Sequence, residues 1–375
     1  NTITWPAAIT WNGGSAPTLL GANSYSLTGQ VFNLVTSDGG STWYGYEEVN
    51  NDNDQPYEVY AWGYNNYGEL DNSSRTEYSS PIQIPGTSWS IVKGAFQTGN
   101  AFAGIKNDGT LWMWGNNNTG MLGQNQGPGA YSSPVQIPGT TWANVSMGWA
   151  HTQAVKTDGT MWAWGRGTLG DLGQNNRTNY SSPVQIPGTT WSTSKCNVQC
   201  GTKTDGTLWM WGYQAWGALG QNQTSVSYSS PVQIPGTNWS EAWNEQHISM
   251  ALKTDGTLWM WGVNQAGTLG QNKSNTSDSV SSPIQIPGTT WSFMGNGNAA
   301  NGGGVNAGKT DGTLWSWGHA GWGALGLNDN VDRSSPTQVP GTTWSGLSLG
   351  GWGVNGGFKS DGTMWTWGFN SYGAL

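Results

Sequence analysis

The chain has 375 residues, only 9% of them charged, and a formal net charge of −8 at pH 7. Ordinary soluble domains are about 25% charged, but no apolar run approaches the roughly 18–20 residues that a membrane-spanning helix needs, so membrane insertion is not expected. Lys and Arg total 13, too few for the basic stripe that neutralises phosphates, and nucleic-acid binding is therefore not expected either.

The first 45 residues differ in kind from the rest of the chain. They hold three short stretches that favour β structure, namely Ile3–Pro6, Gly13–Leu19 and Val31–Gly45. These stretches resemble a short β segment found in tail-fibre and other virion appendage proteins of bacteriophages. The resemblance implies a virion context and divides the chain into an N-terminal β segment, 1–45, and a repeat domain, 46–375.

A β hairpin is predicted at the start of the repeat domain. Thr42–Val49 and Tyr57–Gly63 are rich in residues that favour strands, and the polar segment Asn50–Pro56 lies between them.

The dominant feature of the remaining chain is an internal repeat. A Trp-Gly pair recurs at intervals of 47 to 56 residues, and each pair is followed by Gly-x-Leu six positions after its Trp. Self-similarity at about this period is typical of solenoids and propellers. The Trp residues of the pairs are Trp62, Trp114, Trp164, Trp211, Trp261, Trp317 and Trp367.

Ser132–Gly173 illustrates one repeat. Ser132–Gly139 alternates apolar and polar residues between two prolines, which predicts a short edge strand. Trp142 begins a second strand, and Gln153–Lys156 forms a third. The Asp-Gly pair at 158–159 then predicts a tight hairpin, in which both turn residues take a positive φ, and a fourth strand ends at the Trp-Gly pair.

Four strands per repeat and no helical period predict an all-β chain folded as a β-propeller. Four motifs recur in a fixed order over about residues 57–375: Pro-Val-Gln-Ile-Pro-Gly, Asp-Gly-Thr, Trp-x-Trp-Gly and Gly-x-Leu-Gly. This order resembles the regulator-of-chromosome-condensation type repeat. The resemblance implies a seven-bladed propeller of four-stranded blades. The Pro-bracketed strand occurs six times rather than seven, so we expect an N-terminal segment to pair with the last blade and close the ring.

Regularly spaced tryptophans are predicted to be structural, because a propeller needs large side chains to fill the wedges between its blades. This applies above all to the seven Trp-Gly tryptophans, which are expected to be buried.

Catalysis is not expected from this sequence. His151, His247 and His319 fall in different repeats, and there is no nucleophile motif, metal-spaced His/Cys set or phosphate loop. No cofactor and no metal are therefore predicted. Cys196 and Cys200 flank a shortened connection, and a disulfide in an oxidising compartment and two free thiols are equally compatible with this spacing.

Aromatic residues at irregular copies of regular positions are the candidate binding residues, because the fold does not require them. One group follows the Trp-Gly tryptophan by five residues, and the other lies in a connection of variable length. They could stack on a sugar or anchor a protein contact, although local packing over the loops is an alternative. They are Tyr67, Trp216, Trp322 and Tyr372, and Phe96, Trp149, Trp243 and Trp352.

These observations predict a non-enzymatic structural or binding propeller, on a bacteriophage virion as an appendage, decoration or host-surface adhesion protein. Low charge and few lysines favour a virion surface or extracellular location. The expected partners are a protein or a cell-surface glycan and other virion proteins, with homo-oligomerisation left open. Two alternatives stand beside this hypothesis: a secreted protein-binding propeller resembling a β-lactamase inhibitor, and a nucleotide-exchange or chromatin-binding propeller, which the acidic balance disfavours.

Overall fold

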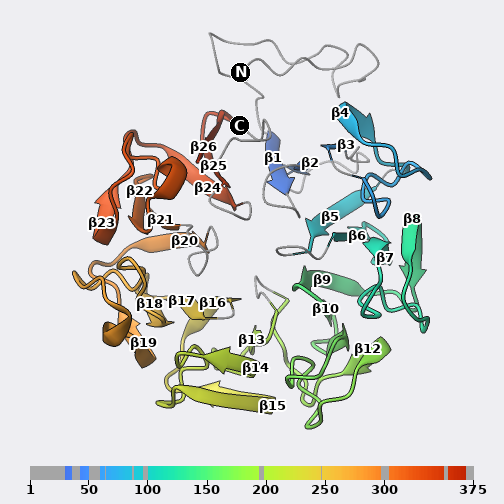
Figure 1. The fold of residues 1–375 in the computed structure, drawn as a ribbon, viewed down its shortest axis with the longest axis horizontal. Coiled ribbons are helices and arrows are strands. Elements are labelled where there is room, and N and C mark those ends of the chain that lie inside the picture. The colour runs from blue at the N-terminus through green and yellow to red at the C-terminus, as the bar shows by residue number, and fades with distance from the viewer. Residues whose placement is uncertain are drawn as a thin grey trace.

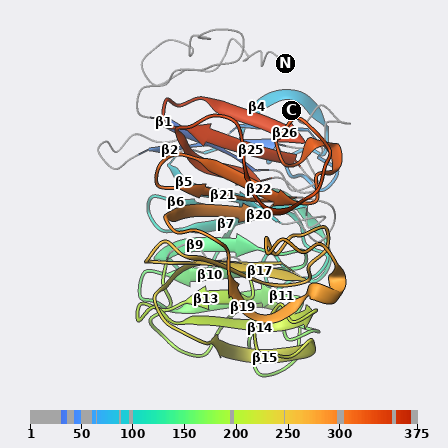
Figure 2. The same cartoon turned by 90° about the vertical axis from the view of Figure 1, so that its left-hand side faces the viewer.

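The computed structural model describes residues 30–35, 43–49, 60–63, 65–86, 88–95, 100–193, 198–245, 247–296, 304–349 and 354–368. Their regular structure is almost entirely β, with two short 3-10 helices, η1 (Thr276–Asp278) and η3 (Gly321–Gly323). Small antiparallel sheets are arranged around a central axis (Figure 1), and the assembly forms a thick disc in side view (Figure 2). The chain is an all-β propeller, as predicted.

The described strands form seven sheets, and within each sheet the strands are hydrogen-bonded in chain order. The first strand of each sheet lies nearest the axis, and the last lies at the rim (Figure 1). The sheets are β1 (Gln30–Val35), β2 (Trp43–Val49), β3 (Tyr60–Gly63) and β4 (Tyr78–Gln83); β5 (Trp89–Gly94), β6 (Ala101–Lys106), β7 (Leu111–Asn116) and β8 (Ala130–Ile137); β9 (Trp142–Met147), β10 (His151–Lys156), β11 (Met161–Gly165) and β12 (Tyr180–Gln185); β13 (Cys200–Thr202), β14 (Leu208–Ala215) and β15 (Ser225–Ile234); β16 (Trp239–Glu245), β17 (Ile248–Lys253), β18 (Leu258–Gly262) and β19 (Val280–Gln285); β20 (Trp291–Asn296), β21 (Gly304–Lys309), β22 (Leu314–Gly318) and β23 (Arg333–Gln338); and β24 (Trp344–Leu349), β25 (Val354–Lys359) and β26 (Met364–Gly368).

The prediction of seven four-stranded blades is not met in full, because five sheets have four strands and two have three. In the β13–β15 sheet, the innermost position is reduced to a single bridge between Trp191 and Lys203. In the β24–β26 sheet, the described residues provide no strand outside β26.

The first sheet takes its strands from the N-terminal part of the chain, as predicted. β2 pairs with β3 and places Trp43 opposite Trp62, and β1 adds the innermost strand. The domain boundary predicted between 45 and 46 therefore falls inside β2. Because β1 lies against β24, the first sheet is next to the last one in the ring.

The Asp-Gly turns differ in type from the prediction. Gly159, Gly206 and Gly256 have φ of 78°, 78° and 76°, as expected, but the preceding aspartates do not have a positive φ. The Gly159 N–H bonds to the Lys156 carbonyl at 3.0 Å, and the Lys156 N–H bonds to the Thr160 carbonyl at 2.9 Å. The loop is thus a three-residue turn with a bulge at the glycine rather than a two-residue turn.

A side-chain network explains why Asp, Gly and Thr recur in these turns. Asp158 Oδ1 accepts hydrogen bonds from the Thr160 N–H at 2.9 Å and the Thr160 hydroxyl at 2.7 Å. Trp162 Nε1 then donates to Thr160 Oγ1 at 3.0 Å. Equivalent bonds lower the pKa of Asp158 and its counterparts, because the carboxylate accepts two hydrogen bonds.

A tryptophan latch, a hydrogen bond from an indole N–H to a main-chain carbonyl, joins six of the seven described sheets to the repeat before them. The second Trp of Trp-x-Trp-Gly donates its Nε1–H to the carbonyl of the middle residue of the preceding Gly-x-Leu, at 2.8–3.1 Å. Five of these rings are fully buried, which confirms their structural role; Trp367 is partly buried, and the side chain of Trp62 lies outside the described part. The donor–acceptor pairs are Trp114–Glu69, Trp164–Met121, Trp211–Asp171, Trp261–Ala218, Trp317–Thr268 and Trp367–Ala324.

A lysine clamp fills the opposite end of each repeat. The ammonium group of the lysine before each turn lies 4.4–5.0 Å from the centres of two tryptophan rings, one from the innermost strand and one from the third. Such cation–π pairs contribute about 0.5–2 kcal/mol each. The six lysines are Lys106, Lys156, Lys203, Lys253, Lys309 and Lys359.

Strand order gives the two faces of the disc different loops. Because neighbouring strands are antiparallel, the connections from first to second strand and from third to fourth strand leave from one face, which we call the loop face. The Asp-Gly-Thr turns lie on the other face. The described loop-face connections are 65–77, 148–150, 166–179, 216–224, 263–279 and 319–332, with 117–129 in the second sheet.

Candidate functional site

Three connections of the loop face, 148–150, 216–224 and 319–332, each present an exposed aromatic side chain. Trp149, Trp216 and Trp322 are 43%, 48% and 53% exposed, so these three candidate binding residues are accessible to a partner. Tyr67 and Trp243 are half-buried, and the latter lies on an innermost strand. Phe96, Trp352 and Tyr372 lie outside the described residues. The candidates thus separate into three exposed tryptophans and two side chains that pack into the fold.

The backbone of Trp216 and Trp322 is in the left-handed region, with φ of 60° and 56°. Bulky residues rarely adopt this conformation, and where they do, it is often at a functional site. Ala266 occupies the equivalent position of the intervening sheet with φ of 55°. Tyr67, Thr119 and Leu169, at the equivalent positions of the first three sheets, do not have a positive φ. The left-handed conformation is therefore shared by three consecutive copies, and two of these carry a tryptophan there.

Trp216 lies at the tip of a longer hairpin. β14 and β15 continue past the point where other sheets end their pairing, with Tyr213 opposite Ser227 and Ala215 opposite Ser225. Tyr213, which is 43% exposed, is a further loop-face aromatic that sequence reasoning missed. The sequence signal is the alternation Ser-Val-Ser-Tyr at 225–228, which lengthens this outer strand at its N-terminal end.

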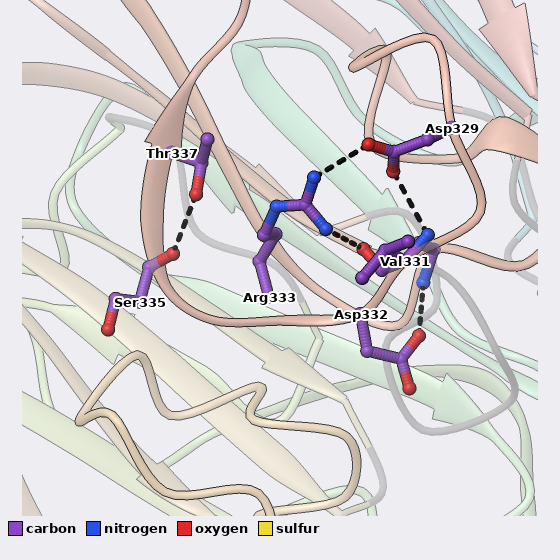
Figure 3. A network of polar contacts seen from close by, with 7 residues as sticks. Asp329, Val331, Asp332, Arg333, Ser335 and Thr337 are labelled. Atoms are coloured by element: carbon purple, nitrogen blue, oxygen red, sulfur yellow. Dashed lines mark hydrogen bonds and ion pairs between the residues drawn. The ribbon is translucent and has the colours of Figure 1, made fainter.

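A polar network holds the loop that presents Trp322. Arg333 Nη2 lies 2.7 Å from Asp329 Oδ2, and Arg333 Nη1 donates to the Val331 carbonyl at 2.6 Å, as Figure 3 shows. Asp332 Oδ1 accepts a hydrogen bond from the Ala320 N–H at 2.8 Å, which ties the far end of the loop to the segment before Trp322. The tryptophan is therefore presented on a fixed rather than a freely moving loop.

Trp149 belongs to a charged cluster at the junction of the third and fourth sheets. The Arg166 guanidinium stacks 4.4 Å from the centre of its ring, and Arg166 Nε lies 3.6 Å from Asp171 Oδ2. The buried Asp171 carboxylate also accepts a hydrogen bond from Gln199 Nε2 at 2.6 Å. The sequence contains a signal for this cluster, because Arg and Asp occur at these two repeat positions only in this copy.

His151 lies beneath this cluster and is 5% exposed. Burial lowers its pKa, the Asp171 carboxylate acts in the opposite sense, and Arg166 lowers it further. Neither ring nitrogen has a hydrogen-bond partner among the described residues. No hydroxyl or thiol is therefore paired with this imidazole there, and the cluster does not contain a nucleophile–base pair of the kind used in acyl transfer.

Other chemical features are limited in the described part of the chain. Its His, Cys, Asp and Glu side chains form no group of three or more that could hold a metal ion. None of its helices is long and apolar enough to cross a membrane. Cys200 is fully buried, with its Sγ 3.9 Å from the Ala242 carbonyl oxygen, and Cys196 lies outside the described residues, so a disulfide and two free thiols stay equally compatible with the sequence.

Comparisons with known proteins identify the repeat. The model of the regulator of chromosome condensation (RCC1) repeat matches residues 108–155, 158–203, 205–242 and 311–353, and a second model of that repeat matches 142–171. The segments 108–203, 205–242 and 311–353 therefore match RCC1 repeats. A mitochondrial RCC1 domain-containing protein of Arabidopsis thaliana, RUG3, is 30% identical over 79 residues, which span 21% of this chain and 18% of that protein.

Several solved structures share the fold. Human WBSCR16 has a TM-score of 0.68 at 18% identity, covering 86% of this chain and 85% of its own. Prp20p of Saccharomyces cerevisiae, described with its binding to Gsp1p and histones, has the same score and identity and covers 87% and 82%. Yeast RCC1 (Prp20) bound to Kap60 has a TM-score of 0.65 at 17% identity, covering 91% and 81%.

The comparisons overturn the predicted location. The relatives are a plant mitochondrial protein and human and yeast proteins, so the virion surface or extracellular location inferred from low charge is wrong. The resemblance of residues 1–45 to bacteriophage appendages receives no support from these matches, nor do virion proteins or glycans as partners. Low charge instead follows from the architecture, because most repeat positions are taken by aromatic, small or neutral hydrogen-bonding residues.

Proposed function

We propose that this chain is a non-enzymatic propeller that binds a protein partner through its loop face. Trp216 and Trp322 carry the proposal: both are about half exposed, and both occupy left-handed backbone positions, where the intervening copy has Ala266. Tryptophan is enriched among the residues that dominate binding energy at protein interfaces. The fixed loops around them reduce the entropy lost on binding.

The Arg166–Trp149 stack extends this surface. Its guanidinium is held by Asp171 on one side and the indole on the other, so it is already ordered before a partner arrives. Arginine is likewise enriched at binding hot spots. A partner that covers the third to sixth sheets would contact the stack together with Trp216.

The fold similarity supports one class of partner best. Prp20p is described as binding Gsp1p and histones, and we propose that this chain binds a partner of the same kind. Nucleotide exchange on a Gsp1p-type protein is the leading activity to test, and histone binding is the second candidate. The net charge of −8 favours a basic protein such as a histone over nucleic acid.

Binding to immobilised chain tests both parts of the proposal, with purified Gsp1p and histones as probes and nucleotide release from Gsp1p as the activity. Trp216→Ala with Trp322→Ala should weaken binding at least about 30-fold, the scale of one hot spot. Val331→Ala, which truncates a side chain 59% exposed in the Trp322 loop, is the matched control and should bind normally. If the wild type binds neither probe, the partner class is wrong. A double variant that unfolds early yet binds normally would show that the two rings serve packing.

A further inference from the structure

The charged side chains of the loop face are unevenly distributed. We call the described loop-face connections of the second, third and fourth sheets the arginine sector; they are 117–129, 148–150, 166–179 and 216–224. Their charged residues are Arg166, Asp171 and Arg177. The described connections of the first, fifth and sixth sheets contain six carboxylates and two cations instead, in 65–77, 263–279 and 319–332. Although the chain has a net charge of −8, the arginine sector therefore has an excess of positive charge.

Only the two arginines of this sector reach solvent. The side chain of Arg166 is 21% exposed, that of Arg177 is exposed, and that of Asp171 is 1% exposed. The Asp171 carboxylate is directed at Arg166 and at Gln199, whose Nε2 donates to Asp171 Oδ1 at 2.6 Å. A partner that covers these connections therefore meets cationic groups and no accessible carboxylate.

One edge of the Arg166 guanidinium has unused hydrogen-bond donors. The guanidinium lies 4.4 Å from the centre of the Trp149 ring, and its Nε lies 3.6 Å from Asp171 Oδ2. Nη1 and Nη2 form another edge, and they make no hydrogen bond within the described part of the chain. Arg333 differs, because its two Nη atoms donate to oxygens of its own loop at 2.6 and 2.7 Å (Figure 3). Arg166 is thus held in place while its Nη edge stays free.

Exposed indoles accompany the arginines. The connection 166–179 is bonded to the fourth sheet, since the Asn175 N–H donates to the Ser229 carbonyl at 2.6 Å. Ser229 belongs to β15, a strand of the hairpin that presents Trp216, and the third and fourth sheets are neighbours in the ring (Figure 1). Trp149 stacks on the guanidinium in the same sector. Two positive charges and two exposed indoles therefore project from adjacent, hydrogen-bonded sheets.

These features favour a carboxylate as the ligand of Arg166. A carboxylate is planar and accepts two parallel hydrogen bonds from one edge of an arginine, and such charge-assisted pairs are stronger than neutral hydrogen bonds. Two cations are too few for other common anionic partners, because proteins that bind DNA make about 6–10 phosphate contacts and segments that bind acidic lipids have about 4–8 basic residues. The exposed indoles favour apolar side chains beside the carboxylate.

We infer that the arginine sector binds an acidic protein segment. The carboxylate of an aspartate or glutamate lies on the Nη edge of Arg166, and an apolar side chain packs against Trp149 or Trp216. The inference rests on the proposed function of the loop face as a protein-binding surface, and it specifies the chemistry of the partner. Asp171 and Gln199 are positioning residues, since they hold the guanidinium and do not touch the ligand. A basic segment would bind elsewhere on the loop face.

Arginine side-chain NMR tests the site directly in the full chain. The sequence has four arginines, so protein labelled only at arginine gives few Nε–H signals, and Arg166→Lys identifies the signal of Arg166. The probe is the peptide acetyl-Glu-Leu-Glu-Leu-Glu-amide, and its control has glutamine in place of each glutamate. The acidic peptide should shift the Arg166 signal saturably and leave that of Arg333 unchanged, because the Nη donors of Arg333 are occupied. An unshifted Arg166 signal, or equal shifts with the two peptides, would overturn the inference.

Inorganic phosphate is the second probe, because it offers anionic oxygens without a peptide. At equal concentration it should shift the Arg166 signal less than the acidic peptide does, since it brings no apolar side chain to the indoles. A larger shift with phosphate would assign the site to phosphate groups and contradict the inference.

Two matched substitutions separate the shape of the guanidinium from its charge. Arg166→Lys keeps the positive charge but lacks the two-nitrogen edge, so it should weaken binding of the acidic peptide about 10-fold or more, as followed by the Trp149 indole N–H signal. Arg177→Lys, in the same connection and exposed, should change the affinity less than about 2-fold. Equal affinities of the two variants would show that only net charge matters, and the assignment to the Nη edge of Arg166 would be wrong.

These outcomes are separable from those of the proposed function. If the peptide shifts Arg166 but the wild type binds neither Gsp1p nor histones, the carboxylate site stands and those partners are wrong. If Gsp1p or histones bind and Trp216→Ala with Trp322→Ala weakens that binding, while the peptide leaves Arg166 unshifted, the loop face binds protein and the inference is wrong.

Discussion

Asp71 is a buried carboxyl group at a position that the other repeats reserve for glycine. It has φ of 53° and is 1% exposed, and neither carboxyl oxygen has a hydrogen-bond partner within the part of the chain that the structure describes. Burial raises its pKa from 3.8 to about 8, with Lys106 acting in the opposite sense. The equivalent glycines, at φ of 63–69°, are Gly123, Gly173, Gly220, Gly270 and Gly326.

This pKa shift predicts a specific dependence of stability on pH. The folded state retains the Asp71 proton up to about pH 8, whereas the unfolded chain releases it near pH 4. The contribution of the protonated Asp71 side chain to the free energy of unfolding is therefore fully present below pH 4, and it is lost as the pH rises toward 8. At about 1.4 kcal/mol per pH unit, the loss between pH 5 and pH 8 is about 2–4 kcal/mol.

Asp71→Gly should therefore be more stable than the wild type, and the gain should grow by about 2–4 kcal/mol between pH 5 and pH 8. Asp71→Asn keeps the size of the side chain without its ionisation, so it should show the same growth with pH but a smaller gain at pH 5. Urea unfolding followed by tryptophan fluorescence at both pH values measures these differences. A free-energy difference between wild type and Asp71→Asn that stays constant with pH would refute the reasoning.

Two further predictions concern the repeat framework. Gly159→Val should lower the free energy of unfolding by roughly 1–3 kcal/mol, because a positive φ strains valine and the new Cβ would lie 3.1 Å from the Thr190 nitrogen. The control is Gly127→Val, whose new side chain enters open space and which should melt like the wild type. Equal melting temperatures of the two variants would mean that the turn has been misread. Lys156→Met keeps the aliphatic stem but removes the ammonium from between Trp142 and Trp162, so unfolding should require about 0.5–2 kcal/mol less. Calorimetry at low and high salt checks the second variant, and a melting temperature equal to that of the wild type would show that the clamp is only packing.

The fold was largely predictable because its determinants are local and repeated. The Asp-Gly-Thr turn forms within five consecutive residues, from Lys156 to Thr160. The same residue types form it in each of the six repeats that contain it. The turn type was misjudged because Asp-Gly alone also fits a two-residue turn, and the bulge depends on which carbonyl Lys156 bonds. Burial of the regular tryptophans followed from their period.

The site was less predictable because its contacts join repeats. Arg166, Asp171 and Gln199 meet only because the third and fourth sheets are adjacent, and no spacing along the chain reveals that meeting. Asp71 is similar: it lies in an acidic stretch of the sequence, so its burial is visible only in three dimensions. Trp216 and Trp322 could be singled out because they break a regular pattern, although sequence alone could not separate them from the half-buried Tyr67.

The tryptophan latch uses a main-chain carbonyl as its acceptor, and this leaves one position of each repeat open to evolutionary change. The side chain at the middle of Gly-x-Leu plays no part in the bond, and it is glutamate, methionine, aspartate, alanine or threonine in different copies. A substitution at this position leaves the hydrogen bond between the tryptophan and the main-chain carbonyl intact. Asp171 stands at such a position and lies 3.6 Å from Arg166 Nε, so the side chains on the loop face can differ between repeats while the hydrogen bonds that join the repeats stay the same.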